Sequence, residues 1–174
     1  MHNESGLRRF VQSPLFSALL FTISLVAIMA VLDYINIGLE RGIGYSALIF
    51  ASFGASGFVM FMMPNSFAAH RRVFVRSYLI GSIVGFAGSL LIGIAGIYVA
   101  AAIVLLVTAM LLYYTKNEHP PAMALAFAFV LFNVGFAGVI ITVVGVILLL
   151  ASKTFEKRLY SALRIPYKNV RRRT

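Results

Sequence analysis

The sequence predicts an all-α, polytopic membrane protein with four to five transmembrane helices and one half-length helical segment. Of its 174 residues, 61% are apolar and only 11% are charged, whereas a soluble domain is about half apolar and about a quarter charged. The apolar residues form runs close to the ~20 helical residues that cross a bilayer core. Such a chain leaves no room for a soluble catalytic domain, so we expect it not to be an enzyme.

Four apolar runs can each cross the membrane, and they cover about residues 15–37, 43–63, 74–95 and 97–114. Pro14 opens the first run at a position that helices tolerate, and Pro64 stops the second. The third run has small residues spaced by four, which lie on one helical face and allow close packing. They are Gly81, Gly85, Ser89 and Gly93.

The last apolar stretch, residues 122–151, is longer than one upright span, because 30 helical residues measure about 45 Å. Asn133, Gly135 and Gly138 offer a place to break it. It is therefore either one long tilted span or a half-length segment over 121–132 followed by a return helix. We favour the second alternative, because five complete crossings would place the basic chain ends on opposite faces.

The net charge of +10 comes from 15 Lys and Arg against five Asp and Glu. The cations cluster beside apolar runs, which is typical of positive-inside topology and of contact with anionic membrane lipids. No basic, water-soluble face suits nucleic acid. We expect a transmembrane domain over 1–152 in the cell membrane (plasma or inner), both termini in the cytoplasm, and a basic tail over 153–174. That tail is either an amphipathic helix on the membrane surface or a disordered segment. The clustered cations are Arg8, Arg9, Arg71, Arg72, Arg76 and eight residues beyond position 152.

Few side chains could carry chemistry, since the chain has three histidines, five carboxylates and no cysteine. Disulfides and thiolate catalysis are excluded, and the residue spacings of intramembrane proteases do not occur. His70, Glu118 and His119 could share a metal ion only through a spacing that arises readily by chance. We therefore expect no metal and no cofactor.

The motif His119-Pro120-Pro121 predicts a helix that begins directly after the histidine, because consecutive prolines fix φ and suit a first turn. In a membrane, such a helix start presents unpaired N–H groups and a positive dipole end, which favour an anion or a carbonyl. His119 would stand at that position with a ring nitrogen able to donate. The alternative is a surface loop in which His119 only caps the turn.

Two further segments are candidates for the same site. Gly54 and Ser56 lie in a stretch of small residues that lets a ligand, or more commonly another helix, approach the backbone. The bend that contains Ser66, His70 and Arg72 is either a plain cytoplasmic loop or a segment that folds an arginine back toward His119.

Taken in order, these motifs resemble the HPP family of integral membrane proteins, which is named for its His-Pro-Pro motif. The resemblance covers about residues 10–160 and rests on Phe53-Gly54-Ala55-Ser56, on the bend from Pro64 to Arg72, and on His119-Pro120-Pro121-Ala122. The chain departs from the family at Asn65, where Glu is usual, and at Arg76-Ser77-Tyr78, where Gly-Gly-His is usual. Some members are implicated in nitrite transport.

The resemblance implies an integral membrane transporter of a small inorganic anion, with nitrite as the leading candidate. The alternatives are a passive anion channel and a non-transporting assembly or sensor protein. We also expect a homo-oligomer, because four or five helices enclose little space. The expected substrate-binding residues are His119, Pro120, Pro121, Arg72, Gly54, Ser56, Ser66 and His70.

Overall fold

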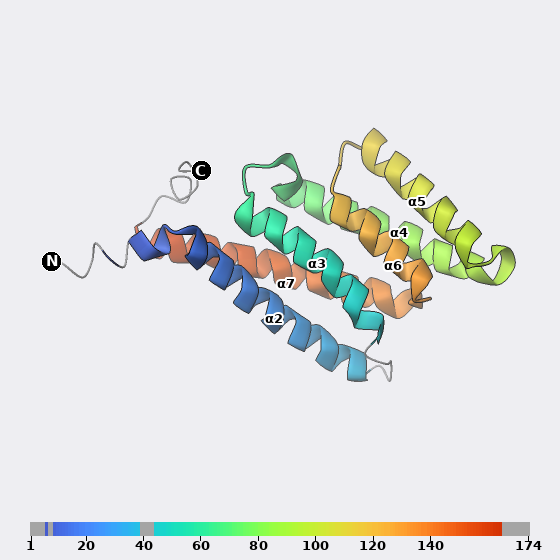
Figure 1. Cartoon of the computed structure of the whole chain (residues 1–174), viewed down its shortest axis with the longest axis horizontal. Coiled ribbons are helices and arrows are strands. Elements are labelled where there is room, and N and C mark those ends of the chain that lie inside the picture. Colours follow the sequence, from blue (N-terminus) through green and yellow to red (C-terminus); the bar gives the residue numbers. More distant parts are fainter. Residues whose placement is uncertain (1–5, 7–8, 39–43, 165–174) are drawn as a thin grey trace.

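The computed structural model describes residues 6, 9–38 and 44–164, and every described element is helical. Four helices are long and apolar enough to cross a membrane, namely α2, α4, α5 and α7, while two shorter apolar helical stretches are Phe50–Met62 within α3 and Pro120–Leu131, which is α6. The predicted fold class is confirmed (Figure 1). The elements are α2 (Pro14–Gly38), α3 (Gly44–Met62), the 3-10 turn η1 (Phe67–Ala69), α4 (Arg71–Ala95), α5 (Ile97–Tyr114), α6 (Pro120–Leu131) and α7 (Gly135–Ala162).

The break that the sequence predicts in the last apolar stretch is confirmed between α6 and α7. Asn133 and Gly135 adopt positive φ angles of 46° and 63°, a region that glycine and asparagine enter most readily. With 12 residues, α6 is about 18 Å long, well short of a bilayer core of about 30 Å.

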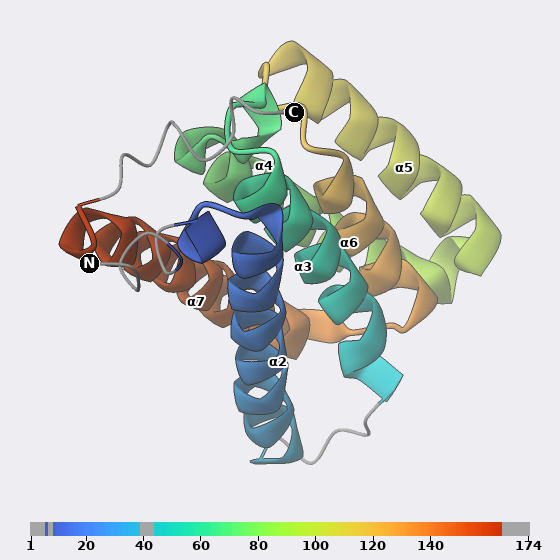
Figure 2. The ribbon, with the colours of Figure 1, turned by 60° about the vertical axis from the view of Figure 1, so that its left-hand side comes forward.

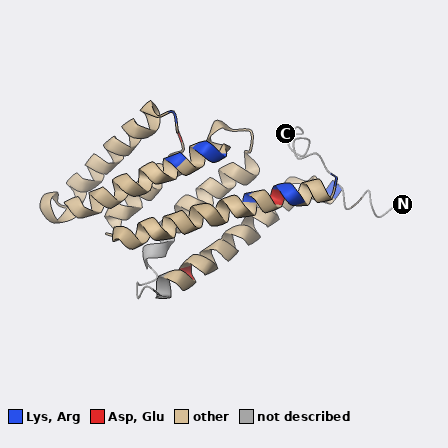
Figure 3. Ribbon diagram, turned by 180° about the vertical axis from the view of Figure 1, so that it is seen from behind, with Lys and Arg blue, Asp and Glu red and all other residues tan. Residues whose placement is uncertain are grey.

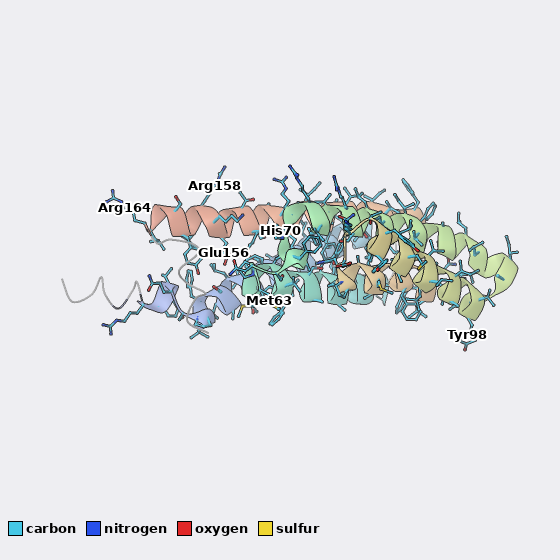
Figure 4. The ribbon with its side chains drawn as sticks, turned by 90° about the horizontal axis from the view of Figure 1, so that it is seen from above. Met63, His70, Tyr98, Glu156, Arg158 and Arg164 are labelled. Carbon is cyan, nitrogen blue, oxygen red and sulfur yellow. The ribbon has the colours of Figure 1, made fainter. Side chains whose placement is uncertain are left out.

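The helix after the break is longer than the expected return helix. α7 has 28 residues and continues without interruption across the expected domain boundary at 152/153. No glycine or proline lies between Gly145 and Pro166 to stop it. In Figure 4, α7 extends beyond its neighbours, with Arg158 near its far end and Arg164 just past it. The rest of the basic tail, residues 165–174, lies outside the described residues.

The bundle is built around α4, which contacts α5, α6 and α7, while α3 contacts α2, α6 and α7 (Figure 2). Glycines on α4 let α6 approach closely. A Cβ added at Gly81 would lie 2.6 Å from the Ala122 carbonyl oxygen, and one added at Gly85 would lie 2.8 Å from the Phe129 Cβ. Gly93, on the same face, would meet nothing within 4 Å. The small-residue face of α4 is therefore a packing surface at Gly81 and Gly85.

The two described ends of the chain lie side by side. The Tyr160 hydroxyl, near the end of α7, lies 3.2 Å from the Ser17 hydroxyl and donates to the Val11 carbonyl at 3.2 Å. Figure 3 shows the Lys and Arg at the start of α4, on the loop after α5 and on the last turns of α7. Arg8 and Arg41 lie outside the described residues.

Candidate functional site

His119 is the N-cap of α6 and is almost completely buried, with 1% of its surface exposed. Its backbone is extended, and Pro120 and Pro121 occupy the first two helical positions. The helix start predicted from the His-Pro-Pro motif is confirmed. The histidine itself lies inside the bundle rather than on a surface loop, because η1 and α3 cover it.

Both ring nitrogens of His119 form hydrogen bonds. Nδ1 lies 3.1 Å from the carbonyl oxygen of Ala68 in η1, and Nε2 lies 2.7 Å from the hydroxyl of Ser56 on α3. A carbonyl oxygen can only accept, so Nδ1 carries a hydrogen and donates to Ala68. The His119 ring therefore links the start of α6 to η1 and to α3.

The hydrogen bonds continue beyond Ser56. The Tyr78 hydroxyl on α4 lies 2.7 Å from the Ser56 hydroxyl and 2.8 Å from the Ser52 hydroxyl. Ser52 in turn donates to the Pro121 carbonyl at 2.6 Å. We call His119, Ser56, Tyr78 and Ser52 the polar chain, which begins at the carbonyl of Ala68 and ends at that of Pro121.

The polar chain lies in apolar surroundings, with its two serines and its tyrosine at most 1% exposed. The Phe74 ring lies 4.7 Å from the Tyr78 ring and 5.6 Å from the His119 ring, centroid to centroid. Burial lowers the pKa of His119 to about 4, against the opposing effect of its hydrogen bond to the Ala68 carbonyl. The imidazole is therefore neutral near pH 7, and Nε2 can accept from Ser56.

A surface cavity of about 430 Å³ is lined by residues of η1, of the end of α5 and of the loop before His119. We call it the vestibule. Two of its lining residues, Phe67 and Glu118, are the chain neighbours of Ala68 and His119. The vestibule therefore adjoins the η1 turn that covers the histidine. It is lined by Phe67, Tyr113, Tyr114, Lys116 and Glu118.

The structure brings together only some of the residues expected at the site. Ser56, His119 and the Pro121 carbonyl belong to the polar chain, whereas the Pro120 side chain is exposed. Gly54 faces α2, since a Cβ added there would lie 3.7 Å from Leu25.

The three residues expected from the bend lie around η1. Ser66 is the N-cap of η1, and within the described residues its hydroxyl is buried without a hydrogen-bond partner. His70 is exposed, and its Nδ1 lies 2.9 Å from the Phe67 carbonyl oxygen. Arg72 is exposed in the first turn of α4. No arginine therefore belongs to the buried polar chain.

Sequence reasoning missed two members of the polar chain, Ser52 and Tyr78. Ser52 could have been found, because it precedes Ser56 by four residues and so lies on the same face of α3. Tyr78 stands where the family usually has the histidine of Gly-Gly-His, and that departure was the available signal. Within the described part of the chain, no three His, Asp or Glu side chains are grouped to hold a metal ion.

Comparison with known protein families gives a match to the HPP transmembrane region over residues 10–166. Comparisons with curated proteins and with solved structures gave no match. The matched region holds the polar chain, the vestibule and all the described helices apart from residues before position 10. Since it also covers most of the sequence, the chain belongs to the HPP family of integral membrane proteins.

Proposed function

We propose that this protein transports a small inorganic anion across the cell membrane, with nitrite as the leading candidate. The buried polar chain is the observation that carries the proposal. Polar groups are expensive within a bilayer, and ionisable ones there commonly mark a substrate or ion pathway. Here buried His119 begins the half-length helix α6, and the vestibule is lined by its neighbour Glu118.

The vestibule is the proposed entry to the site. Its lining carries one cation, Lys116, and one carboxylate, Glu118, and the exposed cations at the start of α4 attract anions at long range. A helix start such as that of α6 favours negative charge. An anion in the vestibule would thus be separated from His119 mainly by η1.

Opening requires η1 to move off His119. Such a movement would free Nδ1–H from the Ala68 carbonyl and make it available to an anion. The unpartnered hydroxyl of Ser66 lies at the start of the same turn, and His70 and Arg72 follow it. We propose that these side chains move with η1 and help to replace the water that the anion gives up.

We also propose that both termini are cytoplasmic, that the protein is a homo-oligomer and that it binds anionic lipids. Cations at the described chain ends support the topology.

A cavity of about 400 Å³ beside α7 supports the binding of anionic lipids. It combines two arginines with apolar side chains, which suits a lipid phosphate above its acyl chain. It is lined by Arg71, Ile147, Leu150, Ala151, Thr154, Phe155 and Arg158.

Flux measurements in proteoliposomes test the proposed transport. Purified protein is reconstituted and loaded with nitrite, nitrate, formate or bicarbonate in separate preparations, and release is followed. We expect nitrite to move, and we expect His119→Ala to abolish its movement. Ser89→Ala is the matched control, since this buried serine bonds only to the Phe86 carbonyl of its own helix.

The outcomes separate the three alternatives. Movement of none of the four anions would contradict transport and favour an assembly or sensor protein. Full flux through a folded His119→Ala variant would contradict the assigned site. Flux that saturates with concentration indicates a transporter, whereas flux that rises in proportion to the gradient indicates a passive channel.

A further inference from the structure

The number of hydrogens in the polar chain differs from the number of contacts that need one. There are five contacts: two at His119, one between Ser56 and Tyr78, one between Tyr78 and Ser52, and one from Ser52 to a carbonyl. Neutral imidazole supplies one N–H, and each of the three hydroxyls supplies one O–H. Four hydrogens therefore serve five contacts.

Changing the tautomer of His119 does not remove the shortage. With the hydrogen on Nδ1, both serines donate outward, to His119 and to Pro121, and Tyr78 has one hydrogen for two serine oxygens. With the hydrogen on Nε2, the other contacts can be made, but the Nδ1 lone pair then faces the Ala68 carbonyl. In each neutral form one contact has no hydrogen.

One added proton supplies the hydrogen that the fifth contact of the polar chain lacks. A doubly protonated His119 donates through Nδ1 to the Ala68 carbonyl and through Nε2 to the Ser56 oxygen. Ser56 then donates to Tyr78, Tyr78 to Ser52, and Ser52 to the Pro121 carbonyl. All five contacts hold a hydrogen, and all the hydroxyls point the same way.

We propose that the polar chain is a binding site for one proton, taken up at Nε2 of His119, and that this proton accompanies the transported anion. The second part rests on the proposed function. The proton comes from solvent, a new N–H bond forms, and the hydroxyl hydrogens of Ser56 and Tyr78 rotate toward the Pro121 end. The resulting imidazolium supplies, inside the bundle, the positive charge that exposed Arg72 does not.

The surroundings of His119 keep its ring neutral until an anion binds nearby or the pH falls. Tyr78 on α4 is the titratable group in contact with His119, and α3 contributes uncharged serines. Lys116 and Glu118 on the preceding loop, His70 after η1 and Arg72 on α4 are exposed. Within the described residues, no carboxylate forms an ion pair with His119. By linkage, an anion bound near His119 raises its affinity for a proton, and the proton raises the affinity for the anion.

Nitrogen NMR on histidine-labelled protein in nanodiscs tests the proton site without any transport. The full chain has three histidines, and His119→Gln assigns the signal. We expect His119 to be neutral at pH 7 and to become doubly protonated in the folded protein on acidification to about pH 3.5.

Ser52→Ala is the decisive variant, because Ser52 does not touch His119 but accepts the hydrogen of Tyr78 when the proton is bound. We expect it to lower the His119 midpoint by about half a pH unit. Ser82→Ala is the matched control, since Ser82 bonds to the backbone carbonyl of Tyr78 and lies outside the polar chain. It should leave the midpoint unchanged.

Three results would overturn the proton site. They are a His119 that stays neutral in the folded protein at the lowest pH, equal midpoints for Ser52→Ala and Ser82→Ala, and unfolding of the wild type before His119 charges. In the last case the proton binds only to the unfolded chain.

Nitrite flux in proteoliposomes tests the coupling separately. Uptake should rise as external pH falls and should not respond to membrane voltage, because one proton balances one anion. Voltage-dependent flux would overturn the coupling. Absence of any flux would contradict the proposed function and leave the NMR result to decide the proton site.

Discussion

Replacing Gly81 with alanine should shift the start of α6 and so disturb the candidate site. The added Cβ would lie 2.6 Å from the Ala122 carbonyl oxygen, which belongs to the backbone and cannot rotate away. Reaching an ordinary contact of 3.4 Å needs a displacement of about 0.8 Å. Overpacking of this kind costs about 1–3 kcal/mol, and alanine regains about 0.5–1 kcal/mol over glycine within a helix.

The net loss is therefore about 0–2.5 kcal/mol, which lowers the thermal midpoint by up to about 10 °C for a chain of this size. Circular dichroism in detergent measures the midpoint. Gly93→Ala is the control, because it makes the same change on the same helix face where a Cβ meets nothing within 4 Å. It should unfold at or above the wild-type temperature. If Gly81→Ala is as stable as Gly93→Ala, close α4–α6 contact does not position His119.

Three other predictions address topology, a buried ion pair and pH. Reporters active on one side of the membrane, fused to the two ends of the chain, should both report the cytoplasm, and opposite results would contradict the paired chain ends at Val11 and Tyr160. Glu156→Ala should lower stability by about 3–5 kcal/mol, because Lys153, 2.7 Å from Glu156 and 8% exposed, would keep its buried charge without this carboxylate. The exposed control Arg158→Ala should leave the thermal midpoint near that of the wild type, and equal midpoints for the two variants would show that the pair contributes nothing. The lowered His119 pKa means that the unfolded chain binds the proton more tightly. The stability from neutral His119 is thus complete above about pH 6.5 and is lost as the pH falls through about 4. Thermal midpoints across this window should fall more in the wild type than in His119→Gln, and parallel curves would contradict the assignment.

Local chemistry made much of the fold predictable. Prolines mark the end of α3 and the start of α6, and Asn133 and Gly135 mark the turn between α6 and α7. Each of these signals acts within a few residues, through φ preferences that hold in any surroundings. The full length of α7 was less predictable, because the sequence beyond Ala151 becomes charged while remaining helical.

The composition of the site depends on neighbours that one sequence does not specify. Gly54 and Ser56 belong to the same motif, yet two residues along a helix turn the side chain to nearly the opposite face. Ser56 therefore meets His119, while Gly54 meets α2. The position of Arg72 depends in the same way on where η1 ends and α4 begins, and this leaves the guanidinium exposed.

Tyr78 shows why a departure from a family pattern can lie at the centre of a site. A phenolic oxygen donates and accepts at one atom, so it can join two serines into one continuous chain, whereas a histidine donates and accepts at separate nitrogens. Serine and tyrosine hydroxyls keep their protons near neutral pH, so within the polar chain only His119 changes charge readily. The motif thus identified the group that can gain a proton. The residue that replaces the family's histidine determines how far the effect of that proton extends, from η1 to the carbonyl of Pro121.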